Sequence, residues 1–114
     1  MTTYETFVDA TLKFNLVTTV AHDLKSITVG GAVSGIGVES SGFKYGFVHE
    51  TVLEMDILTG DGKIITCSPK KNSDLFYAIP NSYATLGYVL RVKIMLQKAK
   101  KYVKITRKKY SDYK

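Results

Sequence analysis

Residues 51–67 read TVLEMDILTGDGKIITC, and the order of side-chain types in this stretch predicts a β-hairpin. Its first half alternates apolar and acidic side chains, which places them on opposite faces of a strand. The apolar side chains are Leu53, Met55 and Ile57, and the acidic ones are Glu54 and Asp56. Residues 59–62, TGDG, supply the turn, because glycine and aspartate favour tight turns between paired strands. Residues 63–67 then return as the second strand.

An amphipathic helix is predicted before the hairpin, at the N-terminus of the sequence. Thr2 and Glu5 have the spacing of a capping box, and Asn15 is the expected stop. The apolar stripe of this helix has helical spacing and consists of Tyr4, Phe7, Val8, Thr11 and Leu12. The helix therefore needs a partner surface to pack against.

A short helix and a long strand are predicted after the hairpin. Asn72 or Ser73 caps the helix, which runs to Ala78 and stops before a proline. Residues 86–96 alternate apolar and basic side chains as a half-buried strand does, and residues 102–106 are a candidate last strand. This order of elements favours an α+β fold with a mainly antiparallel sheet flanked by short helices.

Length and composition limit the classes of protein to consider. A chain of 114 residues suits one domain or one lobe of a larger domain, and 45% hydrophobic with 23% charged residues is typical of a globular chain. The single cysteine, Cys67, excludes an internal disulfide and a cysteine-clustered zinc site. The sequence has neither a signal-peptide pattern nor an apolar run of membrane-spanning length. We expect a location in the cytoplasm or at the periphery of a membrane.

The positive charge is concentrated at the C-terminal end. The formal net charge is +6, but residues 97–114 hold eight Lys or Arg against one acidic residue, Asp112. Residues 1–96 hold eight against nine, so the body is nearly neutral and we expect no nucleic-acid partner for it. The basic end could contact phosphate or an anionic membrane surface. The alternative is a solvated, charged end that keeps an exposed strand from aggregating.

Residues 29–46 contain six of the nine glycines, with serine and apolar residues between them. The pattern fits neither the GxGxxG dinucleotide motif nor the phosphate loop that ends in Gly-Lys-Ser/Thr. A glycine loop with exposed N–H groups and the hydroxyls of Thr28 and Ser34 could hold a pyrophosphate or a flat ring. A tight structural crossover is the alternative interpretation of the same stretch.

The other candidate groups are isolated in the sequence. His22 and His49 have no cysteine or second histidine at ligand spacing, so we expect no metal site and treat both as surface or satisfied histidines. Cys67 is expected to be a small packed residue. Asp23 precedes the glycine stretch and could accept a proton from a substrate, although an aspartate there is also typical of a turn.

Several separate blocks resemble a known family in their order along the chain. The blocks are ITVGG (27–31), GIGVESS (35–41), KYG (44–46), VLEMD (52–56), TGDG (59–62), NSDLFYA (72–78) and TLG (85–87). Together they cover about residues 20–105 and resemble the FAD-linked oxidases of the vanillyl-alcohol-oxidase type. GVESS, SDLFYAIP (73–80) and KYVK (101–104) look most like the Δ24-sterol reductases, whereas the hairpin looks equally like cytokinin dehydrogenases.

The resemblance implies a PCMH-type FAD-binding domain, in which two α+β lobes hold FAD between them. Residues 1–105 look like the second lobe, and residues 106–114 would be a basic tail leading toward a substrate domain. The chain would then be a piece of a longer oxidoreductase or the product of a truncated gene, inactive by itself. Self-association through the face that meets the other lobe is expected.

The resemblance also assigns roles to particular residues. The positions that match cofactor contacts are Thr28, Val29, Gly30, Gly31, Ser34, Gly35, Ile36, Gly37, Val38, Glu39, Ser40 and Val89. Asp23 matches the aspartate that accepts the substrate's proton in cytokinin dehydrogenases. One departure is that residues 82–85, SYAT, lack the glycine usual before TLG, which puts the local turn in doubt.

Flavin chemistry is what the resemblance implies for the parent protein. FAD would exchange a hydride with a small-molecule substrate, at a C=C bond in a sterol-reductase-like enzyme or at a C–N or C–O bond in a dehydrogenase-like one. NADPH would be the electron donor in the first case. The alternative is a non-catalytic interaction module with a structural glycine loop, whose basic tail binds an anionic partner.

Overall fold

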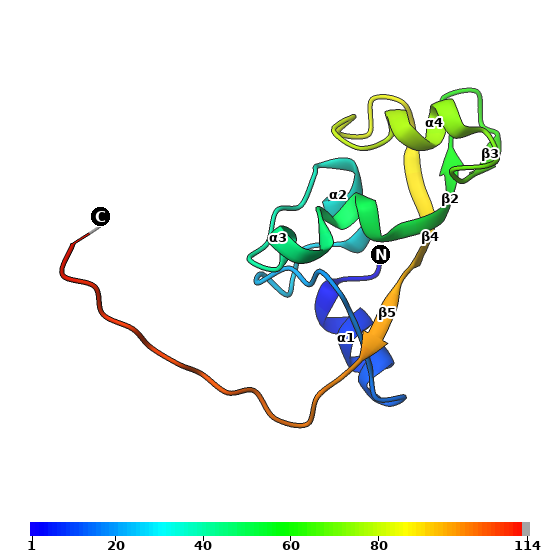
Figure 1. The fold of residues 1–114 in the computed structure, drawn as a ribbon. Helices are drawn as coiled ribbons and strands as arrows, with labels where there is room; N and C mark the ends of the chain where they lie inside the picture. Colours follow the sequence, from blue (N-terminus) through cyan, green and yellow to red (C-terminus); the bar gives the residue numbers. More distant parts are fainter. Residues whose placement is uncertain (113–114) are drawn as a thin grey trace.

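The predicted hairpin is confirmed in the computed structural model, which describes residues 1–112 (Figure 1). Strand β2, Val52–Leu58, pairs antiparallel with β3, Ile64–Cys67, and the turn lies between them. In the turn, Thr59 N donates to Lys63 O at 2.9 Å, and Thr59 Oγ1 donates to Asp61 Oδ1 at 2.6 Å. The local turn chemistry therefore closes the hairpin as the sequence indicates.

A third strand completes the sheet, and two bulges change which side chains are buried. Strand β4, Tyr88–Ile94, pairs antiparallel with β2 in the order β3-β2-β4, so β4 lies at an edge. The pairing of β2 with β4 shifts by one residue at two places. Leu53 in β2 and Leu90 in β4 are the extra residues, and neither has a partner in the opposite strand. Both side chains are exposed, and Val52 is buried in place of Leu53. The prediction that Leu53 shares the buried face with Met55 is therefore wrong.

The long strand predicted over residues 86–96 is divided between two sheets. Strand β4 ends at Ile94, and β5, Leu96–Lys98, pairs instead with β1, Leu16–Thr18, in a separate two-stranded sheet. Residues 102–106 are extended but form no strand, so that prediction is wrong as well. An alternating pattern predicts an extended chain, but the partner strand decides which sheet it joins.

The predicted helices at the two ends of the lobe are present, with different caps. Helix α1, Tyr4–Leu12, is capped by Thr3, whose Oγ1 accepts from Thr6 N at 3.3 Å, and the expected capping box of Thr2 does not form. Helix α4, Ser73–Ala78, follows Asn72. The Asn72 side chain makes no cap and instead donates to Thr66 O at 2.9 Å. The helix is thus tied to the hairpin.

The glycine-rich stretch is partly helical, where a glycine loop or a tight crossover was predicted. It contains α2, Val29–Ser34, α3, Gly42–Tyr45, and the 3-10 helix η1, Val48–Thr51. Glycine disfavours helix by about 1 kcal/mol relative to alanine, so local propensity does not explain α2. Tertiary burial does, because Val29, Ala32 and Val33 are all buried.

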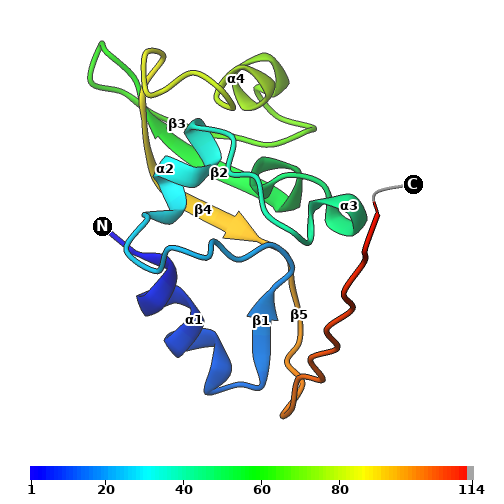
Figure 2. The same cartoon turned by 90° about the vertical axis from the view of Figure 1, so that its left-hand side faces the viewer.

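The core lies between β2, β3 and the helices α2, η1 and α4. Figure 2 shows this half of the molecule above a second half, in which α1 lies beside β1 and β1 pairs with β5. The buried apolar side chains are Tyr4, Val20, Val29, Ala32, Val33, Val48, Val52, Met55, Ile57, Cys67, Phe76 and Ile79. Cys67 is fully buried, which confirms it as a packed residue, and burial raises the pKa of its thiol. Among residues 1–112 no helix is long and apolar enough to span a bilayer.

Candidate functional site

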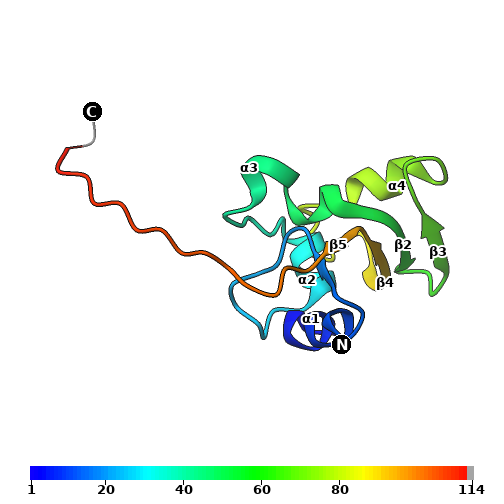
Figure 3. The same ribbon diagram turned by 60° about the horizontal axis from the view of Figure 1, so that its bottom comes forward.

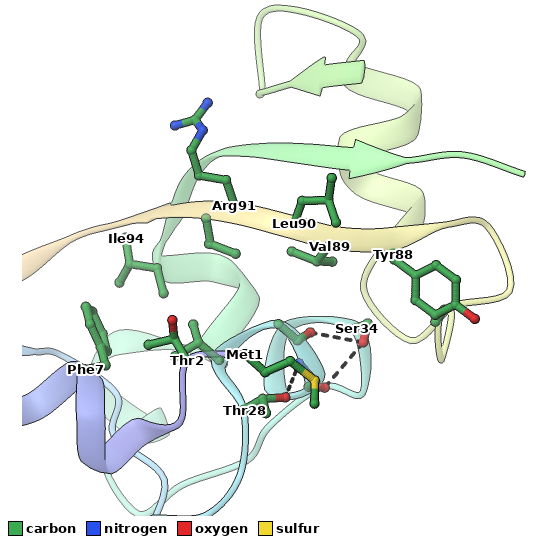
Figure 4. Close-up of a pocket in the computed structure, with 15 residues that line it drawn as sticks. Met1, Thr2, Phe7, Thr28, Ser34, Tyr88, Val89, Leu90, Arg91 and Ile94 are labelled. Carbon is green, nitrogen blue, oxygen red and sulfur yellow. Dashed lines mark hydrogen bonds between the residues drawn. The ribbon is translucent and has the colours of Figure 1, made fainter. Parts of the chain in front are cut away.

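A groove of about 680 Å³ lies between α2, the edge strand β4 and the N-terminal segment (Figure 4). Its α2 wall consists of Thr28, Val29, Gly30, Gly31 and Ser34. The β4 wall consists of Tyr88, Val89, Leu90, Arg91, Val92 and Ile94, and Met1, Thr2, Phe7 and Ala84 complete the lining. This volume lies within the ~300–1,000 Å³ range of small-molecule and cofactor sites.

Two hydroxyl groups on the α2 wall have complementary hydrogen-bonding capacity. Thr28 Oγ1 caps α2 by accepting from Gly31 N at 3.2 Å, so its own O–H can still donate. Ser34 Oγ donates to Gly30 O at 3.1 Å, so its lone pairs can still accept. One wall of the groove thus offers a donor to a ligand oxygen and an acceptor to a ligand N–H.

The opposite wall offers main-chain groups, because β4 has a strand partner on one side only. A row of its N–H and C=O groups faces away from β2. Val89 O lies on this side, 3.4 Å from the point where a Cβ on Gly30 would stand. This is an ordinary van der Waals distance, so α2 lies close against β4 at Gly30, and no side chain of Gly30 enters the groove.

The glycines further along the chain serve packing inside the lobe. A Cβ on Gly37 would lie 2.8 Å from His22 Nε2 and 2.9 Å from Val48 Cγ2, and one on Gly35 would lie 3.0 Å from Gly31 O. Neither glycine lines the groove. The two interpretations of the glycine stretch therefore apply to different halves of it: the first half faces the groove and the second half is a close-packed crossover.

The only Lys or Arg that lines the groove within the described chain is Arg91. Its Nε contacts Asp56 Oδ2 at 2.5 Å and its Nη2 contacts Glu54 Oε1 at 2.7 Å. The hydrogen bond from Arg91, helped by one from Thr66, holds the pKa of Asp56 below its usual value. Because the guanidinium is already neutralised, this wall suits the uncharged parts of a ligand better than a phosphate.

Six of the predicted contact residues come together at the groove and six do not. Thr28, Val29, Gly30, Gly31, Ser34 and Val89 line it. Gly35, Ile36, Gly37, Val38, Glu39 and Ser40 lie outside the lining, and so does the exposed Asp23. For these seven positions the roles implied by the resemblance stay predictions.

Glu39 is engaged inside the protein. Its Oε1 lies 2.5 Å from His22 Nδ1, and the two side chains are only 7% and 17% exposed. The His22 ring packs edge-on against Tyr4, with the centroids 5.6 Å apart. Burial, with a smaller contribution from Glu39, raises the pKa of Tyr4 to about 12. His22 is thus a satisfied histidine, whereas His49 Nδ1 is buried without a hydrogen-bond partner among the described residues.

The turn between α4 and β4 keeps a left-handed backbone without glycine. Asn81, Tyr83 and Ala84 have φ of 63°, 48° and 64°. Tyr83 N donates to Ser34 O at 3.1 Å, which ties the turn to the end of α2. The backbone thus keeps the left-handed conformation that glycine favours, although no glycine is present. The residues that adopt this conformation carry side chains and are strained by it. Ala84 then closes one end of the groove.

Several groove residues have no sequence pattern that indicates a site, among them Phe7, Ala84, Tyr88 and Leu90. Tyr88 and Leu90 were assigned to the buried face of a strand, yet they are 66% and 53% exposed. No local pattern distinguishes an apolar residue in a core from one that lines an open groove. No cluster of metal-ligating side chains occurs in residues 1–112.

The fold and the groove define an α+β protein with a largely apolar groove of the size of a small-molecule or cofactor site. Residues 2–68 match the family described as FAD binding domain, and the chain belongs to this family. The resemblance and the fold class stated from the sequence are thereby confirmed, and FAD is the cofactor of the family.

Curated proteins and a solved structure agree with this family. The chain is 43% identical over 86 residues to the Δ24-sterol reductase of Rattus norvegicus, covering 75% of this chain and 17% of the relative. It is 42% identical over 101 residues to cytokinin dehydrogenase 10 of Oryza sativa subsp. japonica, covering 89% and 18%. The crystal structure of 6-hydroxy-D-nicotine oxidase from Arthrobacter nicotinovorans superposes with a TM-score of 0.75 at 23% identity, covering 86% and 21%. The chain thus spans about a fifth of the length of the proteins it matches.

The residues of the groove fit part of an FAD molecule. The glycines of the lining leave space for a flat ring or a ribityl chain, and the apolar side chains of β4 suit the face of a ring. Thr28 and Ser34 supply a donor and an acceptor for its polar edge. No unpaired cation for the pyrophosphate lies in the lining of the described chain.

Proposed function

We propose that this chain forms one wall of the FAD site of an FAD-dependent oxidoreductase. The observation that carries the proposal is the groove between α2 and β4, where six positions implied by the family resemblance meet on one open surface. The similarity to two groups of flavin-linked relatives supports the same function.

Thr28, Ser34 and Val89 are the residues that would orient the cofactor. Thr28 would donate to an oxygen of FAD, Ser34 would accept from an N–H group, and the main chain of Val89 would meet the edge of a ring. Bound FAD supplies a ring that accepts or releases a hydride. The apolar side chains of β4 would exclude water from the buried face of that ring.

A substrate and an electron donor belong to the whole enzyme. We propose a small molecule reduced at a C=C bond, with NADPH as donor, or one oxidised at a C–N or C–O bond. The second chemistry requires a proton acceptor, and Asp23 is our candidate because its carboxylate is exposed on the turn that precedes α2. Taken alone, the chain should have no turnover, because the groove would supply only one wall of the cofactor site.

Amide chemical shifts of the isotope-labelled chain test the binding proposal, since they detect weak binding at individual residues. FAD is expected to shift the amides of Gly30, Gly31 and Val89, which line the groove, but not that of Gly42 in α3, which lies outside the lining. Shifts confined to other surfaces, or none with FAD in large excess, would contradict the proposal.

A matched pair of variants separates a specific contact from a general effect. Thr28→Val keeps the shape of the side chain but removes the hydroxyl that faces the groove, and it should weaken the FAD-dependent shifts. Thr106→Val makes the same chemical change in the exposed tail and should leave the shifts as they are. Because Thr28 also caps α2, the circular dichroism of both variants is compared first.

We also propose that the isolated chain self-associates through the same wall. Tyr88 and Leu90 leave apolar surface exposed beside an unpaired strand edge, which favours contact with a second copy. Light scattering should give a mass above that of the monomer, and Leu90→Lys should lower it. A clean monomer at all concentrations refutes the self-association without touching the FAD proposal.

A further inference from the structure

Tyr88 stands at one end of the groove with its ring unpartnered. Figure 4 shows the ring at the start of β4, whereas Ile94 and Phe7 lie toward the other end. Among residues 1–112, neither a second aromatic ring nor a cation packs against the ring of Tyr88. Within the part of the chain that the structure describes, a ligand in the groove can therefore reach a face of this ring.

The backbone holds Tyr88 in a fixed place between the two walls of the groove. Strand β4 has β2 as its partner, where Tyr88 pairs with Leu58, and α2 lies close to β4 as well (Figure 3). Gly87 has φ 150°, and a Cβ there would lie 2.6 Å from Leu58 O, so a residue with a side chain could not come this close to β2. In the turn that precedes β4, Tyr83 N donates to Ser34 O at 3.1 Å, which links the turn to α2. A ring on such a pre-organised backbone loses little freedom when it binds.

The other groups of the groove that could stack on a flat ring are already engaged. Phe7 is the second aromatic residue of the lining, and its ring packs edge-on against Tyr4 with the centroids 6.4 Å apart. A guanidinium can also stack on a flat ring, but that of Arg91 is held by two carboxylates. Tyr88 is thus the side chain of the described lining that offers a flat and unpartnered face.

We propose that Tyr88 stacks on a flat ring of the FAD that the groove is proposed to hold, so this role depends on that site. FAD has two such rings, the isoalloxazine and the adenine, and each is a planar heterocycle of the kind that stacks on tyrosine. Stacking favours one orientation of the ring in addition to burying its surface. Tyr88 is thereby a cofactor-binding residue that fixes the plane of the ring, while Thr28 and Ser34 reach its polar edge.

Chemical-shift titrations of the isotope-labelled 114-residue chain test the stacking with three ligands. They are FAD, FMN, which has the isoalloxazine ring without the adenine, and ADP, which has the adenine ring without the isoalloxazine. FAD and whichever of the other two carries the stacked ring are expected to move the Tyr88 ring protons upfield. Tyr88→Leu keeps apolar surface but has no ring, and it should weaken the binding of FAD about fivefold. Tyr88→Phe keeps the ring and should bind FAD about as tightly as the parent chain.

Tyr83→Leu is the matched control, because Tyr83 is similarly exposed in the turn before β4 but does not line the groove. It should leave the affinity for FAD unchanged, and circular dichroism compares the folding of all three variants with that of the parent.

Three results would overturn the role of Tyr88 while FAD still shifts the groove amides. They are full FAD affinity in Tyr88→Leu, with or without weaker self-association; equal losses in Tyr88→Leu and Tyr88→Phe; and Tyr88 ring resonances that neither FMN nor ADP moves. In each case the FAD site itself stands. If FAD shifts no groove amide at all, the site and the stacking fail together.

Discussion

Replacing Ala84 by glycine should stabilise the protein, although glycine usually does the opposite. Ala84 has φ 64°, in the left-handed region that costs a residue with a Cβ about 1–2 kcal/mol. Glycine removes this strain but loses about 0.5–1 kcal/mol through the greater freedom of the unfolded chain. The difference is a gain of about 0.5–1 kcal/mol, which corresponds to a rise in the melting temperature of roughly 2–8 °C. Thermal and urea unfolding, followed by circular dichroism, measure both quantities.

The same substitution in a right-handed helix supplies the matched control. Ala10 is exposed inside α1, so Ala10→Gly should destabilise the protein by about 1 kcal/mol. The two variants differ only in backbone conformation, and opposite signs of the change in unfolding free energy are expected. If Ala84→Gly lowers stability as much as Ala10→Gly does, the turn is not left-handed and the explanation for the missing glycine fails.

Three further predictions concern buried and charged groups. Glu39→Gln leaves the imidazole of His22 without its carboxylate and should cost about 3 kcal/mol in urea unfolding; a change under about 0.5 kcal/mol would show that the pair contributes little. Hydrogen bonding by Arg91 lowers the pKa of Asp56, so its stabilisation is present above the unfolded pKa and is lost as pH falls through the lower folded value. Asp56→Asn should therefore flatten the loss of stability in acid, and an unaltered acid limb would contradict this linkage. Cys67 should react slowly with a thiol reagent at neutral pH and quickly in urea, because it is fully buried and burial raises its pKa; equal rates would contradict its burial.

Elements that depend on short stretches of sequence were predictable. The hairpin, the first helix and the helix over residues 73–78 follow from periodicity, turn residues and caps, which act within a few residues. Their details were less predictable: the bulges expose Leu53 and Leu90 and bury Val52. A bulge is set by how two distant strands pair, so no pattern inside one strand reports it.

The glycine stretch shows the largest difference between prediction and structure. Composition indicated a loop or a tight crossover, yet Val29–Ser34 is a helix, because Ala32 and Val33 gain more from burial than the glycines lose in helical propensity. The helix also changes the role of two candidate site residues. Thr28 and Ser34 line the groove, and their hydroxyls also stabilise the helix itself.

The amino-acid sequence alone determined the local elements, the near-neutral body with its basic end, and the resemblance to FAD-linked oxidases. Each of these depends on neighbouring residues or on blocks that can be matched one by one. Only the tertiary structure decided that Gly30 lies against Val89 in the lining of one groove, that β4 is an edge strand and that Glu39 turns inward to His22. These contacts join segments from different parts of the chain, and their geometry depends on strand register and packing, which only the folded chain defines.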